Sequence, residues 1–428
     1  MRLLVKGGRV VDPANDLDKV LDILVEDDKI VETGQNIYAE DCIIIEAHGK
    51  LVCPGFIDLH THLREPGFEY KEDIYSGTRA AAAGGFTTVC CMPNTDPVAD
   101  NKTVISFIKE QARVKGVVNV LPVGAISKKQ EGQELSPIAE LFQAGCVALS
   151  DDGRPVRRAD LMRYAMEYAK MFDLPIFSHC EDRDLSGDGQ VHEGFYSTYY
   201  GLKGIPAAAE EVMVARDIIL SQLTGAKVHI CHVSTRGSVE LIRRAKEEGV
   251  NVTAEVTPHH LVLTDEVIGS YDADTKVNPP LRSREHVEAL LKGLNEGVID
   301  CIATDHAPHE REAKDCEYNM AAFGISGLET AIPVSMKLVH EGKLSLKRWV
   351  EAYTVKPASI LNIDRGSLTP GGKADITIID PELIKTVEVE KFYSRGWNTP
   401  FKGMKFKGWP FMTIVNGKIV FEDGEIKV

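Results

Sequence analysis

Apolar runs alternate with helical patterns through the middle of the chain. The runs are short and rich in β-branched residues, and they lie at 56–60, 87–92, 118–123, 146–150, 175–178, 227–231, 251–256 and 300–304. Apolar positions with helical spacing fall between them, at 102–115, 159–172, 207–223, 239–248 and 284–296. Continuously apolar strands joined by helices are typical of a parallel sheet covered on both faces. Eight of them predict an α/β fold, a (β/α)₈ TIM-type barrel over residues 53–365.

The two ends of the chain show short strand patterns without helices. At the start these lie at 3–11, 22–26 and 42–46, and near the end at 374–380 and 411–422. Asn416-Gly417 between Thr413-Ile414-Val415 and Lys418-Ile419-Val420 is a strong signal for a two-residue hairpin. Because short strands need partners and chain ends often lie close together, we predict one small composite β domain from residues 1–52 plus 366–428.

Composition and charge narrow the class of protein. The chain has 49 Lys and Arg against 64 Asp and Glu, a formal net charge of −15. Such a surface repels phosphate backbones and anionic lipid, so we expect neither nucleic acid nor a membrane as partner. The nine cysteines form no CxxC pair, which favours reduced thiols and a cytoplasmic location. No segment reaches the ~18 uninterrupted apolar residues of a membrane span.

Histidine and aspartate residues stand at the ends of five of the predicted barrel strands. His60 and His62 close the first strand, and residues two apart on a strand point to the same side. The other strands end in single residues of this kind: Asp151, His179, His232 and Asp305. In a TIM barrel all carboxyl ends of the strands face one mouth, so these six side chains should converge there.

Imidazole and carboxylate groups in this number suit Zn²⁺. Six ligands are too many for one four-coordinate zinc ion but enough for two ions that share a bridging ligand. Two such ions hold a hydroxide between them near neutral pH, because metal binding lowers the pKa of water to about 7. Two Zn²⁺, two aspartates and one hydroxide leave a formal charge of +1, which favours an anionic substrate.

Several motifs together resemble the bacterial type I dihydroorotases of the amidohydrolase superfamily. The resemblance covers essentially the whole chain, and the motifs that carry it are His60-Thr61-His62-Leu63-Arg64-Glu65-Pro66-Gly67, Met92-Pro93-Asn94-Thr95, Ser150-Asp151-Asp152-Gly153, Val277-Asn278-Pro279-Pro280-Leu281-Arg282 and Ala303-Thr304-Asp305-His306-Ala307-Pro308-His309. Membership would imply the reversible cyclisation of N-carbamoyl-L-aspartate to L-dihydroorotate in pyrimidine (UMP) synthesis.

The resemblance also implies roles for individual residues. It makes His60, His62 and Asp305 ligands of one metal ion, His179 and His232 ligands of a second, and Asp151 the bridge. The bridging hydroxide would be the nucleophile, and Asp305 the general acid and base. Substrate contacts would come from His62, Arg64, Asn94, Asn278, His309, Phe323 and Gly324. Arg64 follows the histidine pair by two positions, and its planar fork suits a carboxylate.

Other functions compete with this interpretation. Dihydropyrimidinase (hydantoinase) and allantoinase share the fold, but they normally carry a carboxylated lysine as the bridge, and residues 147–152 contain no lysine. A catalytically inactive barrel that supports aspartate transcarbamoylase is a different class, which the intact ligand set disfavours. A homodimer and an association with aspartate transcarbamoylase are possible partnerships. Residues 310–322 form either a surface loop or a lid over the substrate.

Overall fold

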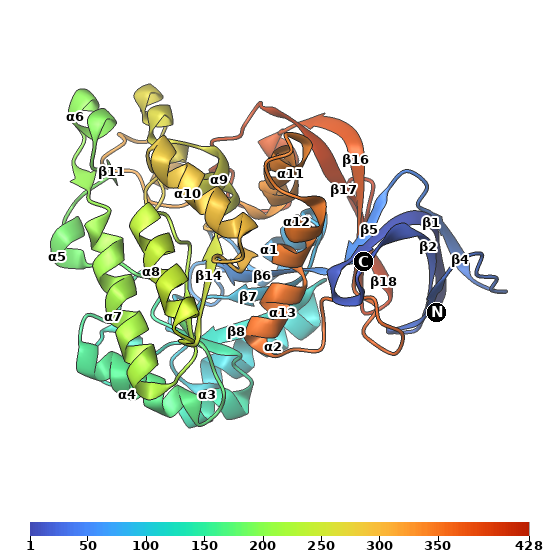
Figure 1. Ribbon diagram of the computed structural model, residues 1–428, viewed down its shortest axis with the longest axis horizontal. Coiled ribbons are helices and arrows are strands. Elements are labelled where there is room, and N and C mark those ends of the chain that lie inside the picture. The colour runs from blue at the N-terminus through green and yellow to red at the C-terminus, as the bar shows by residue number, and fades with distance from the viewer. Residues whose placement is uncertain (428) are drawn as a thin grey trace.

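Eight parallel strands form the centre of the molecule (Figure 1). The computed structural model describes residues 1–427. The strands follow one another in chain order across the sheet, as β6 (Phe56–Thr61), β7 (Phe86–Cys91), β8 (Asn119–Gly124), β9 (Ala148–Ser150), β10 (Ile176–Ser178), β13 (Val228–Ile230), β14 (Val252–Val256) and β15 (Cys301–Ile302). A parallel bridge between Thr61 and His306 joins the first strand to the chain just after the last. The predicted eight-stranded barrel is confirmed.

Helices cover the outside of this barrel. They are α1 (Ile74–Ala83), α2 (Lys102–Lys115), α3 (Ile138–Ala144), α4 (Ala159–Lys170), α7 (Ala208–Thr224), α8 (Arg236–Glu247), α10 (Arg284–Asn295), α11 (Ala331–His340), α12 (Leu346–Tyr353) and α13 (Val355–Leu361). Short elements stand in the loops at the mouth: α5 (Arg183–Ser186), β11 (Val191–His192), α6 (Phe195–Tyr200), β12 (Gly204–Ile205) and α9 (Pro258–Val262). Helix α8 begins three residues before the predicted start, because the Thr235 side chain caps it by accepting from Ser238 N.

Strands from both ends of the chain form one separate sheet. It contains β1 (Arg2–Asp12), β2 (Leu17–Glu26), β3 (Lys29–Gly34), β4 (Ile43–Glu46), β5 (Leu51–Pro54), β16 (Ile376–Thr386), β17 (Lys405–Val415), β18 (Lys418–Glu422) and β19 (Glu425–Ile426). The antiparallel pairing of β5 with β16 joins the two halves, with Val52 opposite Ile378. The predicted composite β domain is therefore present, and Asn416-Gly417 forms the hairpin between β17 and β18. Its boundaries at residues 52 and 366 stay a prediction.

The connection between β16 and β17 returns from this sheet to the barrel. Within it, the backbone N–H groups of Tyr393 and Ser394 donate to the Glu329 carboxylate, at 2.8 and 3.3 Å. Burial, and then the nearby Glu72 carboxylate, raise the pKa of Glu329 to about 8. No helix among residues 1–427 is long and apolar enough to cross a membrane.

The raised pKa of Glu329 predicts a pH dependence of stability. The folded state holds this proton more tightly than the unfolded chain, so its stabilising contribution is complete below the ordinary pKa of 4.5 and is lost as the pH rises through about 8. In Glu329→Gln, which has no such proton, we expect the melting temperature to fall less steeply over this range. Thermal unfolding at a series of pH values measures both slopes. Glu312→Gln at an exposed position should keep the parental slope, and equal slopes for parent and Glu329→Gln would refute the assignment.

Candidate active site

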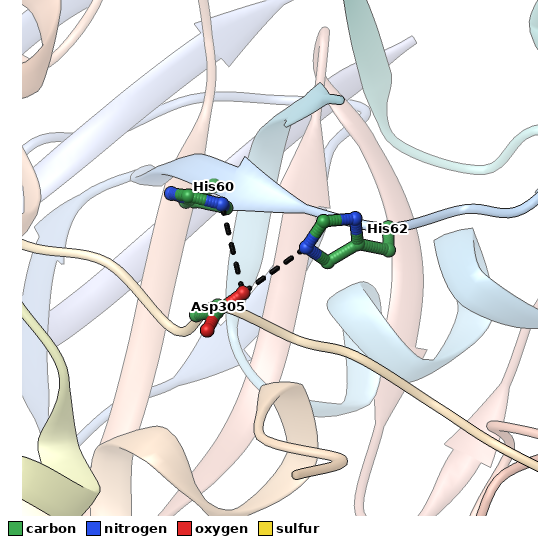
Figure 2. A group of neighbouring side chains, drawn as sticks. All are labelled: His60, His62 and Asp305. Atoms are coloured by element: carbon green, nitrogen blue, oxygen red, sulfur yellow. Dashed lines mark hydrogen bonds and ion pairs between the residues drawn. The ribbon is translucent and has the colours of Figure 1, made fainter. Parts of the chain in front are cut away.

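His60 and His62 point from the end of β6 toward one carboxylate, that of Asp305 (Figure 2). Asp305 Oδ1 lies 3.5 Å from His60 Nε2 and 3.1 Å from His62 Nε2. All three side chains are buried. The strand alternation used in the sequence prediction therefore places both imidazoles on the same side of β6.

A second carboxylate, that of Asp152, lies at the centre of the four histidines. Its Oδ1 is 3.3 Å from His60 Nε2, 3.5 Å from His179 Nδ1 and 3.7 Å from His232 Nε2. Its Oδ2 is 3.5 Å from His62 Nε2. Asp152 is thus the residue that faces both predicted metal positions.

This arrangement corrects the prediction for Asp151. Asp151 Oδ1 accepts hydrogen bonds from the backbone N–H groups of Ile126 (2.9 Å) and Ser127 (3.1 Å), and its Oδ2 accepts from the Ser127 hydroxyl. These hydrogen bonds hold the Asp151 carboxylate against the loop after β8. Strand β9 ends at Ser150, and the two consecutive aspartates then point in different directions, so only Asp152 reaches the histidines.

The distal nitrogens of three histidines are held by oxygen atoms. His60 Nδ1 lies 2.7 Å from Glu255 Oε1, His62 Nδ1 lies 2.9 Å from Asn94 Oδ1, and His179 Nε2 lies 3.3 Å from Glu181 Oε2. An oxygen acceptor there fixes the tautomer, so the other ring nitrogen offers its lone pair to the centre of the cluster. Glu255 and Glu181 were missed by the sequence prediction. Their signals were a carboxylate within the apolar strand β14 and a carboxylate two residues after His179.

The donor set fits a bound cation. His60 Nε2 and Asp152 Oδ1 are buried and have no hydrogen-bond partner among residues 1–427, although they face one another. Burial alone would lower the pKa of His60, but the carboxylates of Asp152, Glu255 and Asp305 outweigh it and hold this pKa well above its ordinary value. A proton on His60 would balance the negative charge of these carboxylates, which is the role that a bound metal ion would take. Two groups have metal-ligand spacing here, His60 with His62 and Asp305, and His60 with Asp152 and His232.

A cavity of about 330 Å³ opens above these residues. Every predicted substrate contact lines it, namely His62, Arg64, Asn94, Asn278, His309, Phe323 and Gly324, together with Asp152, His179, His232 and Asp305. His60 lies beneath them, fully buried. Residues 181, 183 and 187–190, which follow β10, form another part of the wall with Gly153, Ile205 and Ala307, and none of these was predicted.

Arg64 brings a guanidinium group to this cavity. Its Nε has no hydrogen-bond partner among residues 1–427, and its Nη2 lies 3.5 Å from His309 Nε2. The second arginine of the wall, Arg183, is engaged with Glu181 at 3.2 Å and with the Gly153 carbonyl. Arg64 therefore presents the guanidinium edge that is free to bind an anion.

His309 stands next to Arg64 as a neutral group. Its Nε2 donates to the Phe323 carbonyl at 2.9 Å. Burial, followed by the charges of Arg64, Lys71 and Lys314, lowers the pKa of His309 to about 2. Of the other predicted contacts, Asn278 Nδ2 donates to Glu181 Oε2 at 3.2 Å.

Comparison with known proteins gives one consistent family. The sequence model described as dihydro-orotase-like matches residues 49–238, and that of the amidohydrolase family matches residues 225–421. A dihydroorotase of Pelotomaculum thermopropionicum is 55% identical over 428 residues, all of both chains. One from Acetivibrio thermocellus is 54% identical over 422 residues, 98% of this chain and 99% of the relative.

Solved structures show the same architecture. An L-hydantoinase (dihydropyrimidinase) from Arthrobacter aurescens superimposes with a TM-score of 0.90 at 28% identity, over 100% of this chain and 97% of its own. A dihydropyrimidinase from Brevibacillus agri NCHU1002 is 24% identical with a TM-score of 0.87, over 100% of this chain and 96% of its own, and this likeness shows the fold alone.

Proposed function

Because the chain belongs to the dihydroorotase family of amidohydrolases, we propose that it interconverts N-carbamoyl-L-aspartate and L-dihydroorotate in the cavity above Asp152 and Asp305. It is an enzyme that acts on cyclic amides of small molecules. The observation that carries the proposal is the convergence of four histidines and two aspartates beneath a cavity in which Arg64 presents a free guanidinium edge.

The residues divide into two metal positions that share one carboxylate. His60, His62 and Asp305 would hold one ion, His179 and His232 the other, and Asp152 would face both. We propose Zn²⁺ at both positions, since imidazole and carboxylate donors suit it. When bound, such ions lower the pKa of a water molecule and polarise the amide carbonyl.

Asp305 is placed to move protons in either direction of the reaction. It lines the cavity, and the neighbouring imidazoles of His60 and His62 lower its pKa against the effect of burial, which keeps it ionised. In ring opening it would accept the proton of the attacking water and pass it to the departing ring nitrogen. In ring closure it would take the ureido N–H proton as the nitrogen attacks the side-chain carboxyl carbon, and return that proton to the carboxyl oxygen, whose bond to carbon breaks and which leaves as water.

Arg64 would hold the substrate carboxylate, with Asn94 and His309 beside it. Two parallel charge-assisted hydrogen bonds from its guanidinium would fix the carboxylate and thereby orient the ring. Asn278 and the backbone of Phe323 and Gly324 would contact the ring edge. A hydantoin or dihydrouracil lacks this carboxylate, so Arg64 favours dihydroorotate over the substrates named by the hydantoinase structures.

The direct test is an ultraviolet assay of dihydroorotate consumption, with and without added Zn²⁺. The proposal expects zinc-dependent turnover of dihydroorotate and little turnover of dihydrouracil or allantoin; the reverse preference would make this chain a different cyclic amidohydrolase. An inactive protein after zinc addition would instead support the scaffold alternative. Cytoplasmic location, self-association and association with aspartate transcarbamoylase stay predictions.

Arg64→Met tests carboxylate recognition. We expect kcat/KM for dihydroorotate to fall by roughly 10²–10³-fold, because removing one partner of a buried charge pair costs a few kcal/mol. Any residual turnover of dihydrouracil should change far less, since that ring has no carboxylate. Arg113→Met, at an exposed position on α2 outside this cavity, should match the parent in both assays. An equal loss on both substrates would contradict the assignment.

A further inference from the structure

The connection between β16 and β17, residues 387–404, passes from the small sheet to the mouth of the barrel. Figure 1 shows these two long strands running beside α11. Val387, Val389 and Phe401 of the connection form one buried cluster with Val334 of α11. The connection is thus packed onto the barrel by apolar contacts.

Hydrogen bonds fasten one part of this connection to the chain beside Asp305. Ser394 Oγ donates to Glu72 Oε2 at 2.5 Å, and His306 Nε2 lies 3.3 Å from the same oxygen. His306 Nδ1 accepts from Gly327 N at 3.1 Å, so the proton of this ring is on Nε2 and is donated to Glu72. Glu72, fully buried, therefore links residue 394 to residue 306.

Four residues further on, the Asn398 carboxamide uses all its hydrogen-bonding capacity on two loops of the mouth. Nδ2 donates to the carbonyls of Ala307 and Gly324, both at 3.0 Å. Oδ1 accepts from His309 N at 3.0 Å and from Ser326 Oγ at 2.9 Å. Asn398 is only 4% exposed. Only an amide side chain offers two N–H donors together with a carbonyl oxygen that accepts, which is what these four bonds require.

The two loops so joined carry three of the proposed substrate contacts. Residues 307–309 bear His309, and residues 323–326 bear Phe323 and Gly324. The loops lie so close that a Cβ on Gly324, whose φ is +142°, would stand 2.7 Å from the Ala307 carbonyl oxygen. Besides the bond from His309 Nε2 to Phe323, the backbone bond from Ala307 N to the Ile325 carbonyl and the Asn398 carboxamide link them.

We propose that Asn398 is a positioning residue for substrate binding, through which the C-terminal β domain sets the spacing between His309 and the Phe323-Gly324 backbone. The inference rests on the proposed function, which gives those groups the substrate carboxylate and the ring edge. Asn398 does not line the cavity, so it acts through the groups it holds. It stabilises the bound substrate and the transition state about equally, because these contacts are remote from the bond that forms and breaks.

The test is Asn398→Asp in the zinc-loaded enzyme, assayed with dihydroorotate. The substitution keeps the shape but turns a carboxylate oxygen toward two carbonyl oxygens, replacing two buried hydrogen bonds by repulsion. We expect KM to rise about tenfold or more, with kcat within about threefold of the parent. A purely structural role would lower the fraction of active enzyme at unchanged KM. Combined with His309→Ala, the substitution should cost less than the product of the two single losses, because the two residues share one contact.

A matched control is Asn295→Asp, since the Asn295 carboxamide also donates to two backbone carbonyls, those of Leu291 and Lys343, at the end of α10. It should leave KM unchanged. If Asn398→Asp fails to fold, Ser326→Ala decides the question by removing only one bond to Asn398 Oδ1: a two- to threefold rise in KM supports the proposal and an unchanged KM overturns it. An unchanged KM in a folded Asn398→Asp enzyme also overturns it. A parent that does not consume dihydroorotate refutes the proposed function, and this inference with it.

Discussion

Asp152→Asn is expected to abolish activity and most metal binding. The Asp152 carboxylate lies within 3.3–3.7 Å of ring nitrogens from all four histidines, and an amide supplies neither its charge nor a second anionic oxygen. Losing the shared ligand removes one donor from each metal position at once. We expect kcat to fall by at least roughly 10³-fold, as for residues that act as a unit in catalysis. Metal analysis after gel filtration, together with the ultraviolet assay, measures both effects.

Asp151→Asn is the matched control, because it changes the neighbouring residue in the same way. An asparagine oxygen can still accept from the backbone N–H groups of Ile126 and Ser127, so the loop after β8 should keep its place. We expect unchanged metal content and a change in kcat of less than about tenfold, since only one side-chain hydrogen bond is altered. Loss of metal from Asp151→Asn but not from Asp152→Asn would reverse the correction made from the structure.

The second large effect is expected for Asp305→Asn. General acid and base catalysis contributes roughly 10²–10⁴-fold, and an amide can neither take up nor return the proton. Asp305 is also a proposed metal ligand, so the assay has to separate its two roles. Adding Zn²⁺ until metal analysis shows the parental content should not restore activity, in ring opening or in ring closure.

A carboxylate of the same cavity provides the comparison for Asp305. Asp188 lines the cavity too, but it is exposed and forms an ion pair with Lys203. Asp188→Asn should stay within about threefold of the parent in kcat, since exposed ion pairs contribute little. An Asp305→Asn enzyme that keeps both its zinc and more than a tenth of the parental kcat would show that another group moves the proton.

The sequence alone determined the fold class and most of the site. Short, mostly apolar runs mark all eight barrel strands, because a parallel strand covered on both faces is largely buried. His60, His62, His179, His232 and Asp305 could be found because a barrel brings the ends of its strands to one mouth. The hairpin at Asn416-Gly417 was equally local, since two residues with positive φ suffice to define it.

Only the tertiary structure showed which of two neighbouring aspartates faces the histidines and which distant residues support the site. Asp151 and Asp152 have the same chemistry one position apart, and the choice depends on hydrogen bonds from residues 126 and 127 that no local pattern encodes. Glu255 acts on a histidine 195 positions away, and Asn398 joins loops 72 to 91 positions before it. The residue type gives a side chain its length and its hydrogen-bonding chemistry. Which partners come within 3 Å of it depends on how the packing of the core brings distant parts of the chain together.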